Sequence, residues 1–148
     1  MRYGISEIIN KAAAAKSKDE KVKILRENNS IPLLTVLQTA LDPRYVWSLP
    51  EGPVPYTPSA HPDGYGTLYQ EAKRFYLFIE GMHPTLKQTR REQLFIGLLE
   101  SLEPKDAELL VMIKDKKLPK GLDAKIINEA FPGLIQGKEE KKDNEKVT

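Results

Sequence analysis

Five lysines near the carboxyl end of the chain are the residues whose types and spacing best suit binding chemistry. They fall between Leu110 and Ile127, where five lysines less two aspartates leave a local charge of +3. Ammonium groups beside free backbone N–H groups, here expected near Gly121 and Asp123, are what a phosphate chain binds. We predict a phosphate-binding turn whose contacts are Lys114, Lys116, Lys117, Lys120 and Lys125. The alternative is a solvated helix end, where lysines favour the helix dipole.

Two neighbouring arginines form a second candidate for binding phosphate. Arg90 and Arg91 fall in the first turn of a predicted helix, where the positive end of the helix dipole disfavours cations. Such a placement can serve a phosphate of a partner, and the same side chains can equally be solvated. Both arginines are included among the predicted phosphate contacts, and the two interpretations stay open.

The sequence lacks the residues that other classes of functional site need. The sequence contains no cysteine, which excludes disulfides, thiolate metal sites and cysteine nucleophiles. Its two histidines, His61 and His83, are too few for a histidine metal site. No P-loop, dinucleotide or hydrolase motif is present, and the acidic residues are expected on solvated helix faces. We predict no catalytic residues, no metal and no cofactor.

The elements that must position these cations are predicted to be six or seven short helices in a compact, all-α bundle. Apolar residues recur at helical spacing from Ile5 to Ala12, which predicts the first helix. A helix over Thr67–Ile79 has an apolar face. Its inward residues are expected to be Leu68, Ala72, Phe75, Phe78 and Ile79.

Residues that cap helices mark where the other helices begin. Two capping boxes, in which a hydroxyl and a carboxylate satisfy first-turn N–H groups, open two of them. Single capping residues precede two more, and Glu103-Pro104 starts another, since proline is tolerated in a first turn. The boxes are Ser17-x-x-Glu20 and Thr89-x-x-Glu92, and the single caps are Ser30 and Asp123.

The segment 42–66 is predicted to be a long loop rich in proline and aromatic residues. Its six prolines lack N–H donors and restrict the residues before them, which excludes a helix or a central strand. Loops of this length are often functional. Its aromatic rings could stack on unpaired bases. We instead expect Trp47 to pack against the helices, because burying its large apolar surface is strongly favourable.

Length and composition predict one domain, residues 1–135, followed by a charged tail, 136–148, that is expected to be disordered. The net charge of +2 is weak for a DNA-binding protein. No apolar run approaches the roughly 20 residues that cross a membrane, and the first residues do not form a signal peptide. We therefore expect a cytoplasmic protein without a membrane partner.

The stretch from Lys114 to Ile135 resembles the end of the N-terminal helical DNA-binding domain of bacteriophage ATP-dependent DNA ligases. The likeness lies in a helix, a basic turn and a second helix that ends in an aromatic-Pro-Gly-Leu-Ile segment, here Phe131–Ile135. Weaker similarities extend the resemblance back to residue 5. They are Ile5-Ser-Glu-Ile-Ile9, Lys16-Ser-Lys18, Ile24-Leu-Arg-Glu-Asn28 and Leu33-Leu34.

The resemblance implies an all-helical domain that grips duplex DNA across the minor groove, mainly through backbone phosphates, and a phage source. The ligase nucleophile is the lysine of a Lys-x-Asp-Gly motif, and this chain has no such motif. We therefore predict a non-catalytic protein that binds duplex or nicked DNA in the infected cell, accessory to replication, repair or recombination. A separate ligase catalytic domain or another replication protein is its expected protein partner.

The alternative function is a protein-interaction module derived from the same domain, with little affinity for DNA. The near-neutral charge is consistent with that reading. Its first candidate surface is the loop from Tyr45 to Tyr65, because aromatic clusters anchor protein interfaces.

Overall fold

The protein is all-helical, as its sequence predicts. The computed structural model describes residues 3–58 and 66–136. Over these residues the chain forms seven α-helices, one 3-10 helix, two isolated β-bridges and no strand. In chain order the helices are α1 (Ile5–Ala14), α2 (Lys18–Glu27), α3 (Ile31–Leu41), α4 (Leu68–Glu71), the 3-10 helix η2 (Ala72–Phe78), α5 (Gln88–Ser101), α6 (Pro104–Lys114) and α7 (Ala124–Ala130).

Side-chain caps begin four of these helices, α2, α3, α6 and α7, close to where the sequence predicts each helix to start. Oxygens of Ser17, Ser30 and Asp123 accept hydrogen bonds from backbone N–H groups of α2, α3 and α7, at 3.2, 3.2 and 2.9 Å. Glu103 caps α6 in the same way, with Pro104 in the first turn. These bonds satisfy N–H groups that have no partner inside the helix, so each cap fixes where its helix begins.

Two predicted helices differ in detail from the structure. The capping box at Thr89 does not form, because α5 begins at Gln88 and its N-cap, Lys87, makes no side-chain cap. The helix predicted over Thr67–Ile79 is divided into α4 and the 3-10 helix η2. All five of its predicted inward side chains are buried, so the hydrophobic pattern identified the face but not the helix type.

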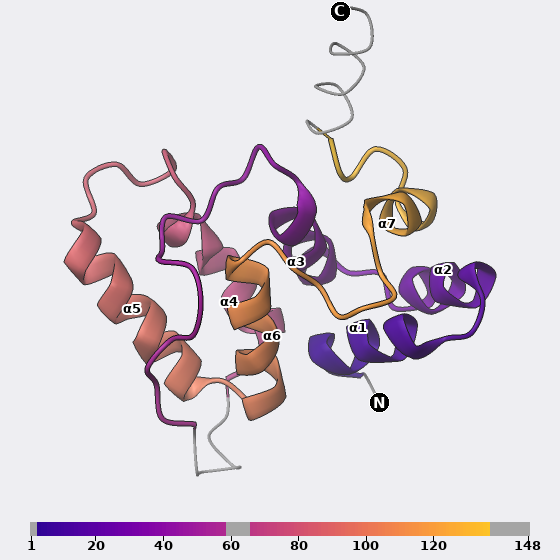
Figure 1. Ribbon diagram of the computed structural model, residues 1–148, viewed down its shortest axis with the longest axis horizontal. Helices are drawn as coiled ribbons and strands as arrows, with labels where there is room; N and C mark the ends of the chain where they lie inside the picture. Colours follow the sequence, from indigo (N-terminus) through magenta and orange to yellow (C-terminus); the bar gives the residue numbers. More distant parts are fainter. Residues whose placement is uncertain (1–2, 59–65, 137–148) are drawn as a thin grey trace, which may run out of the picture.

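The helices are spread along one long axis (Figure 1). α5 lies at one end, α2 and α7 lie at the other, and α3 and α6 occupy the middle. α1 packs on α2 and α2 on α7, while α6 contacts α1, α3 and α5. The segment 115–123 therefore leads from the middle of the molecule to the end formed by α1, α2 and α7.

The loop after α3 contributes to the core. Trp47 is only 6% exposed, and its indole Nε1 donates a hydrogen bond to the carbonyl of Thr39 at 2.9 Å. Its ring contacts those of Phe75, Phe78 and Phe95, with centroids 5.3, 6.3 and 6.3 Å away. The prediction that Trp47 packs against the helices is confirmed. Tyr45 and Tyr56 are also partly buried against the core.

Buried aspartates contradict the expectation that all acidic residues lie on solvated helix faces. Asp106 is 3% exposed and accepts hydrogen bonds from Ser6 N at 3.3 Å and Leu68 N at 3.1 Å. One carboxylate thus binds the amino ends of α1 and α4, where the helix dipoles favour negative charge. Burial raises the pKa of Asp106 above its usual value, and these hydrogen bonds oppose that shift. Asp42 is fully buried as well.

Some predictions fall on residues that the structure does not describe. His61, Tyr65 and residues 137–148 of the predicted tail lie outside the described residues. Within the described ranges, no helix has the length and apolar character needed to cross a membrane.

Candidate nucleic-acid interface

The basic turn begins with a defined helix ending. After α6 the chain reverses at Lys116, whose φ of 63° places it in the left-handed region. The N–H of Lys116 donates to the carbonyl of Ile113 at 2.8 Å, and the N–H of Lys117 donates to that of Met112 at 2.9 Å. This pair of bonds is a Schellman motif, in which glycine usually occupies the left-handed position. A lysine there is strained by roughly 1–2 kcal/mol, so its side chain must contribute something that glycine cannot.

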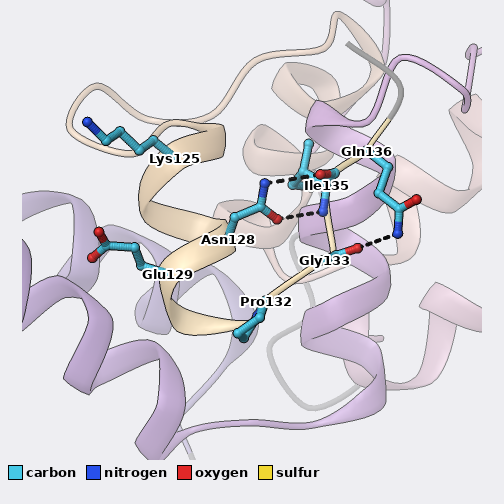
Figure 2. A pocket seen from close by; sticks show the side chains of 7 residues that line it. All are labelled: Lys125, Asn128, Glu129, Pro132, Gly133, Ile135 and Gln136. Atoms are coloured by element: carbon cyan, nitrogen blue, oxygen red, sulfur yellow. Dashed lines mark hydrogen bonds between the residues drawn. The ribbon is translucent and has the colours of Figure 1, made fainter. Parts of the chain in front are cut away.

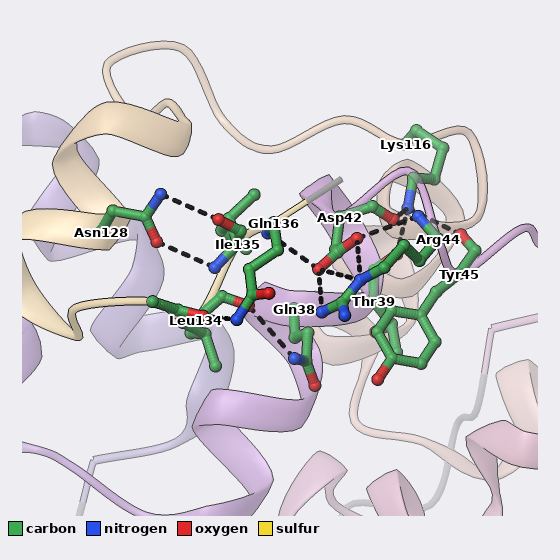
Figure 3. A network of polar contacts seen from close by, with 11 residues as sticks. Gln38, Thr39, Asp42, Arg44, Tyr45, Lys116, Asn128, Leu134, Ile135 and Gln136 are labelled. Atoms are coloured by element: carbon green, nitrogen blue, oxygen red, sulfur yellow. Dashed lines mark hydrogen bonds and ion pairs between the residues drawn. The ribbon is translucent and has the colours of Figure 1, made fainter. Parts of the chain in front are cut away.

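The side chain of Lys116 binds the end of α3 (Figure 3). Its ammonium Nζ donates to the carbonyl oxygens of Thr39, Asp42 and Tyr45, at 2.9, 2.6 and 2.8 Å. These carbonyls lie where α3 ends, so the cation meets the negative end of the helix dipole. Burial lowers the pKa of Lys116 to about 8, while the Asp42 carboxylate acts in the opposite direction. At neutral pH Lys116 is a protonated internal cap.

Lys114 is also directed into the protein. Its side chain is only 1% exposed, and Nζ bonds to Asp115 Oδ1 at 2.7 Å. The same ammonium donates to the carbonyls of Pro50 and Gly52, at 2.8 and 3.0 Å. Lys114 therefore fastens the proline-rich loop to the end of α6, and its position does not support the predicted phosphate contact.

Arg91 has an equivalent role at the other end of the molecule. The residue is 8% exposed. Its guanidinium donates to the carbonyls of Leu77 at 2.9 Å and His83 at 3.1 Å, and to Gln88 Oε1 at 2.7 Å. All three guanidinium nitrogens are used within the fold, so Arg91 ties α5 to the end of η2 and is not available to DNA.

Three of the predicted lysines face outward. Lys117, Lys120 and Lys125 are exposed, and their side chains make no hydrogen bond or ion pair with the described part of the chain. Figure 2 shows Lys125 extending from α7 away from Asn128 and the segment that follows the helix. These three side chains remain available for phosphate groups.

Gly121 holds the outward lysines close to the α1–α2 hairpin. Its φ is +113°, and a Cβ atom there would lie 2.4 Å from the carbonyl oxygen of Ala13. Lys21 Nζ also donates to the carbonyl of Gly121 at 2.6 Å. Only glycine permits this approach. Lys120 consequently lies beside the end of α1, and exposed Lys16 follows that helix closely in sequence.

Arg90 does not join this group of lysines. It is exposed in the first turn of α5, at the end of the molecule opposite α7 (Figure 1). The structure thus separates the seven predicted contacts into three outward lysines, three internal cations and one distant arginine.

The segment after α7, residues 131–136, is fixed to the fold. Asn128 exchanges two hydrogen bonds with the backbone of Ile135, at 3.0 and 2.8 Å (Figures 2 and 3). Gln38 Nε2 donates to the carbonyl of Leu134 at 3.1 Å, and Gln136 N donates to Asp42 Oδ2 at 3.0 Å. Burial raises the pKa of Asp42, but the Arg44 guanidinium and the backbone N–H groups of Arg44 and Gln136 outweigh it and hold the pKa below its usual value. This segment closes the protein over α3.

The described residues hold no group of three or more His, Cys, Asp or Glu side chains arranged for a metal ion. His83 is partly exposed, and its ring stacks on Tyr76 with centroids 6.1 Å apart. Its carbonyl accepts a hydrogen bond from Arg91. The histidine is therefore accounted for by local packing.

The fold and this surface define an all-helical protein with an exposed basic turn. The chain belongs to DUF6433, a family of unknown function whose model matches residues 8–120. No curated protein sequence matches the chain significantly. The matched range covers α1 to α6 and includes Lys117 and Lys120, whereas Lys125 lies beyond it.

Proposed function

We propose that the protein is a non-catalytic DNA-binding protein that grips duplex or nicked DNA through backbone phosphates. The observation that carries the proposal is the set of three outward lysines, Lys117, Lys120 and Lys125, on one short segment. Solvated ammonium groups release the counterions of DNA on binding, which provides affinity without reading the base sequence. The proposed role is accessory to replication, repair or recombination.

The fixed backbone of the turn supports this proposal. The internal bonds of Lys116 and the close packing of Gly121 on Ala13 hold the chain between the outward lysines. A preorganised surface loses less conformational freedom on binding than a flexible loop does. The internal cations thus contribute indirectly, by positioning the lysines that would meet phosphate.

The resemblance to the phage ligase domain supports the same proposal from the sequence side. It implies duplex rather than single-stranded DNA and a phage setting, and the missing Lys-x-Asp-Gly motif accords with a protein that is not itself a ligase. On this proposal a separately encoded ligase catalytic domain, or another replication protein, supplies any chemistry at the nick.

The test is to measure the binding of fluorescent nicked, intact and single-stranded DNA over a salt series. We expect the triple variant K117E/K120E/K125E to bind duplex DNA at least about tenfold more weakly. A matched control, K73E/K87E/K105E, changes the net charge equally at exposed lysines outside the turn. The control should retain most of the affinity. Equal losses in the two variants, or no binding by the parent at low salt, would contradict the proposal.

A second function, a protein-interaction module, is favoured by one surface. Val46, Tyr76 and Met82 are 48%, 47% and 49% exposed. A hydrogen bond from Glu80 N to the carbonyl of Val46 joins the two segments that carry them. Because the loop holds Trp47 in the core, deleting it would unfold the protein, so the test is V46K/M82K. A partner captured equally after nuclease treatment, and lost in that variant, would support this function. Dependence of every partner on nucleic acid would oppose it.

A further inference from the structure

A shallow groove lies between η2 and α5, at the end of the molecule opposite the outward lysines. Its floor is formed by Leu77, Leu94 and Leu98, and Arg74 and Arg90 border it. The side chain of Arg74 is 63% exposed, and Arg90 is also exposed. Two cations thus stand beside an apolar floor, a combination that the lysine turn does not have.

Arg90 is an exposed cation in an unfavourable position on α5. It is the third residue of α5, where the unpaired N–H groups repel a cation. Its guanidinium forms no hydrogen bond or ion pair with any described residue. The neighbouring Arg91, in contrast, uses all its nitrogens inside the fold. No described residue offsets the unfavourable interaction between the Arg90 guanidinium and the positive end of the α5 dipole. A carboxylate of a bound partner would offset it.

Gly97 is a helical glycine that the fold itself does not require. It lies within α5, where glycine is less favourable than alanine, and it lines the groove. A Cβ atom added there would meet nothing within 4 Å. Neither packing nor backbone conformation requires glycine at this position. A glycine does let a bound chain approach the surface of the helix closely.

Glu71 lies at the edge of the same groove and is held by the fold. Its Oε1 atom is buried, accepts no hydrogen bond from the described residues and lies 3.5 Å from Arg74 Nε. Because the atom is buried, a bound chain does not reach it. Glu71 therefore contributes one negative charge to the groove and no contact to a partner.

We propose that this groove binds an acidic segment of a partner protein. Carboxylates of the segment would pair with Arg74 and Arg90, while an apolar side chain covers the leucine floor beside Gly97. Charge complementarity selects this partner over a basic one, since the two arginines outnumber the one glutamate.

A nucleic acid fits the groove less well than a peptide does. The leucine floor has no aromatic ring on which a base could stack, because Phe78 in the groove wall is 2% exposed. An acidic peptide offers both carboxylates for the two arginines and an apolar side chain for the leucines, whereas a nucleic acid offers only the negative charge.

The test uses the full chain and a fluorescein-labelled acidic peptide of about 12 residues, with leucines four positions apart between Asp and Glu. A charge-reversed peptide with lysines in place of the acids, and a duplex oligonucleotide, are the competing probes. Binding is followed by anisotropy and mapped by ¹H–¹⁵N correlation spectra. We expect the acidic peptide alone to shift the amides around Arg90 and Gly97.

Substitutions at the groove test which of its residues bind the acidic peptide. R74E and R90E should each weaken the acidic peptide about tenfold, whereas K73E, an exposed neighbour that does not line the groove, should change it less than about twofold. G97L should raise the melting temperature and still abolish binding, which separates blocked access from misfolding. Equal binding of the basic peptide, displacement by the oligonucleotide, or unchanged affinity in R90E and G97L would overturn the proposal.

Discussion

Two basic regions at opposite ends of the molecule differ in what surrounds their charges. In the turn between α6 and α7, the outward lysines stand in solvent on a backbone fixed by Gly121. In the groove between η2 and α5, Arg74 and Arg90 border a floor of leucines. Solvated point charges suit the regular phosphates of a duplex, whereas planar guanidinium groups beside an apolar floor suit a peptide carboxylate.

Each region also separates neighbouring cations into an inward and an outward set. Lys116 caps the end of α3 while Lys117 faces solvent, and Arg91 binds the end of η2 while Arg90 faces solvent. Arg26, although exposed, also donates to carbonyls of the protein itself, those of Glu129 and Ala130 at the end of α7. Because several cations bind backbone carbonyls within the fold, charge counted from the sequence overstates the charge available to a partner.

The largest effect on stability is expected at Lys114. Replacing it with methionine removes a buried cation and leaves the Asp115 carboxylate, 14% exposed, without its partner. We expect K114M to lose about 3–5 kcal/mol of unfolding free energy, measured by urea denaturation. K117M, at an exposed site, should change it by less than about 0.5 kcal/mol. Similar losses in the two variants would remove the distinction between inward and outward lysines.

A smaller loss is expected at Arg91. R91M removes three part-buried hydrogen bonds, one of them to the carbonyl of Leu77, which should destabilise the protein by about 2–3 kcal/mol. R90E should instead stabilise it by about 0.3–1 kcal/mol, because a carboxylate suits the first turn of α5. Thermal unfolding should show R91M to be less stable and R90E to be more stable than the parent protein. A destabilised R90E would contradict the view that Arg90 is an unfavourable cation in the first turn of α5.

Lys116 should give stability a dependence on pH. Its pKa is about 8 in the folded protein and 10.5 in the unfolded chain. Between these values the unfolded chain binds more protons, so this residue makes stability rise with pH across that window. K116M should lose about 1–2 kcal/mol at pH 7 through its missing hydrogen bonds. The difference between parent and variant should widen from pH 8 to 10, and a constant difference would refute the shifted pKa.

A small gain in stability, similar to that of R90E, is expected at Gly97. G97A should gain about 0.5–1 kcal/mol, because alanine favours the helix and its Cβ meets nothing within 4 Å. Gly121 provides the contrasting position, where G121A would force a Cβ to 2.4 Å from Ala13 O and should destabilise the protein. Melting temperatures of the two variants distinguish the glycine that packing requires from the one that it does not.

The sequence predicted the helices better than it predicted the site. Local signals were sufficient for Ser17, Ser30 and Asp123, because a cap and its N–H partner lie three residues apart. The direction of Lys116 depends on Thr39, Asp42 and Tyr45, more than seventy residues away in the chain. Residue types in a short window carry no information about such partners. The Schellman position of Lys116 was the available signal, since a lysine where glycine is usual points to a required side chain.

The buried carboxylates were missed for the same reason. Asp106 accepts hydrogen bonds from Ser6 and Leu68, which belong to two other helices. Its place in the first turn of α6 is typical of a solvated acid, so only the packing of α1 and α4 distinguishes it.

We propose that DNA binds the lysine turn and not the arginine groove. The proposal can be tested by titrating the ¹⁵N-labelled chain with a nicked duplex and recording ¹H–¹⁵N correlation spectra. We expect shifts confined to the amides of residues 116–126 and the neighbouring end of α1, with Arg90 and Gly97 unchanged. Shifts centred on α5, or none at any DNA concentration, would contradict it.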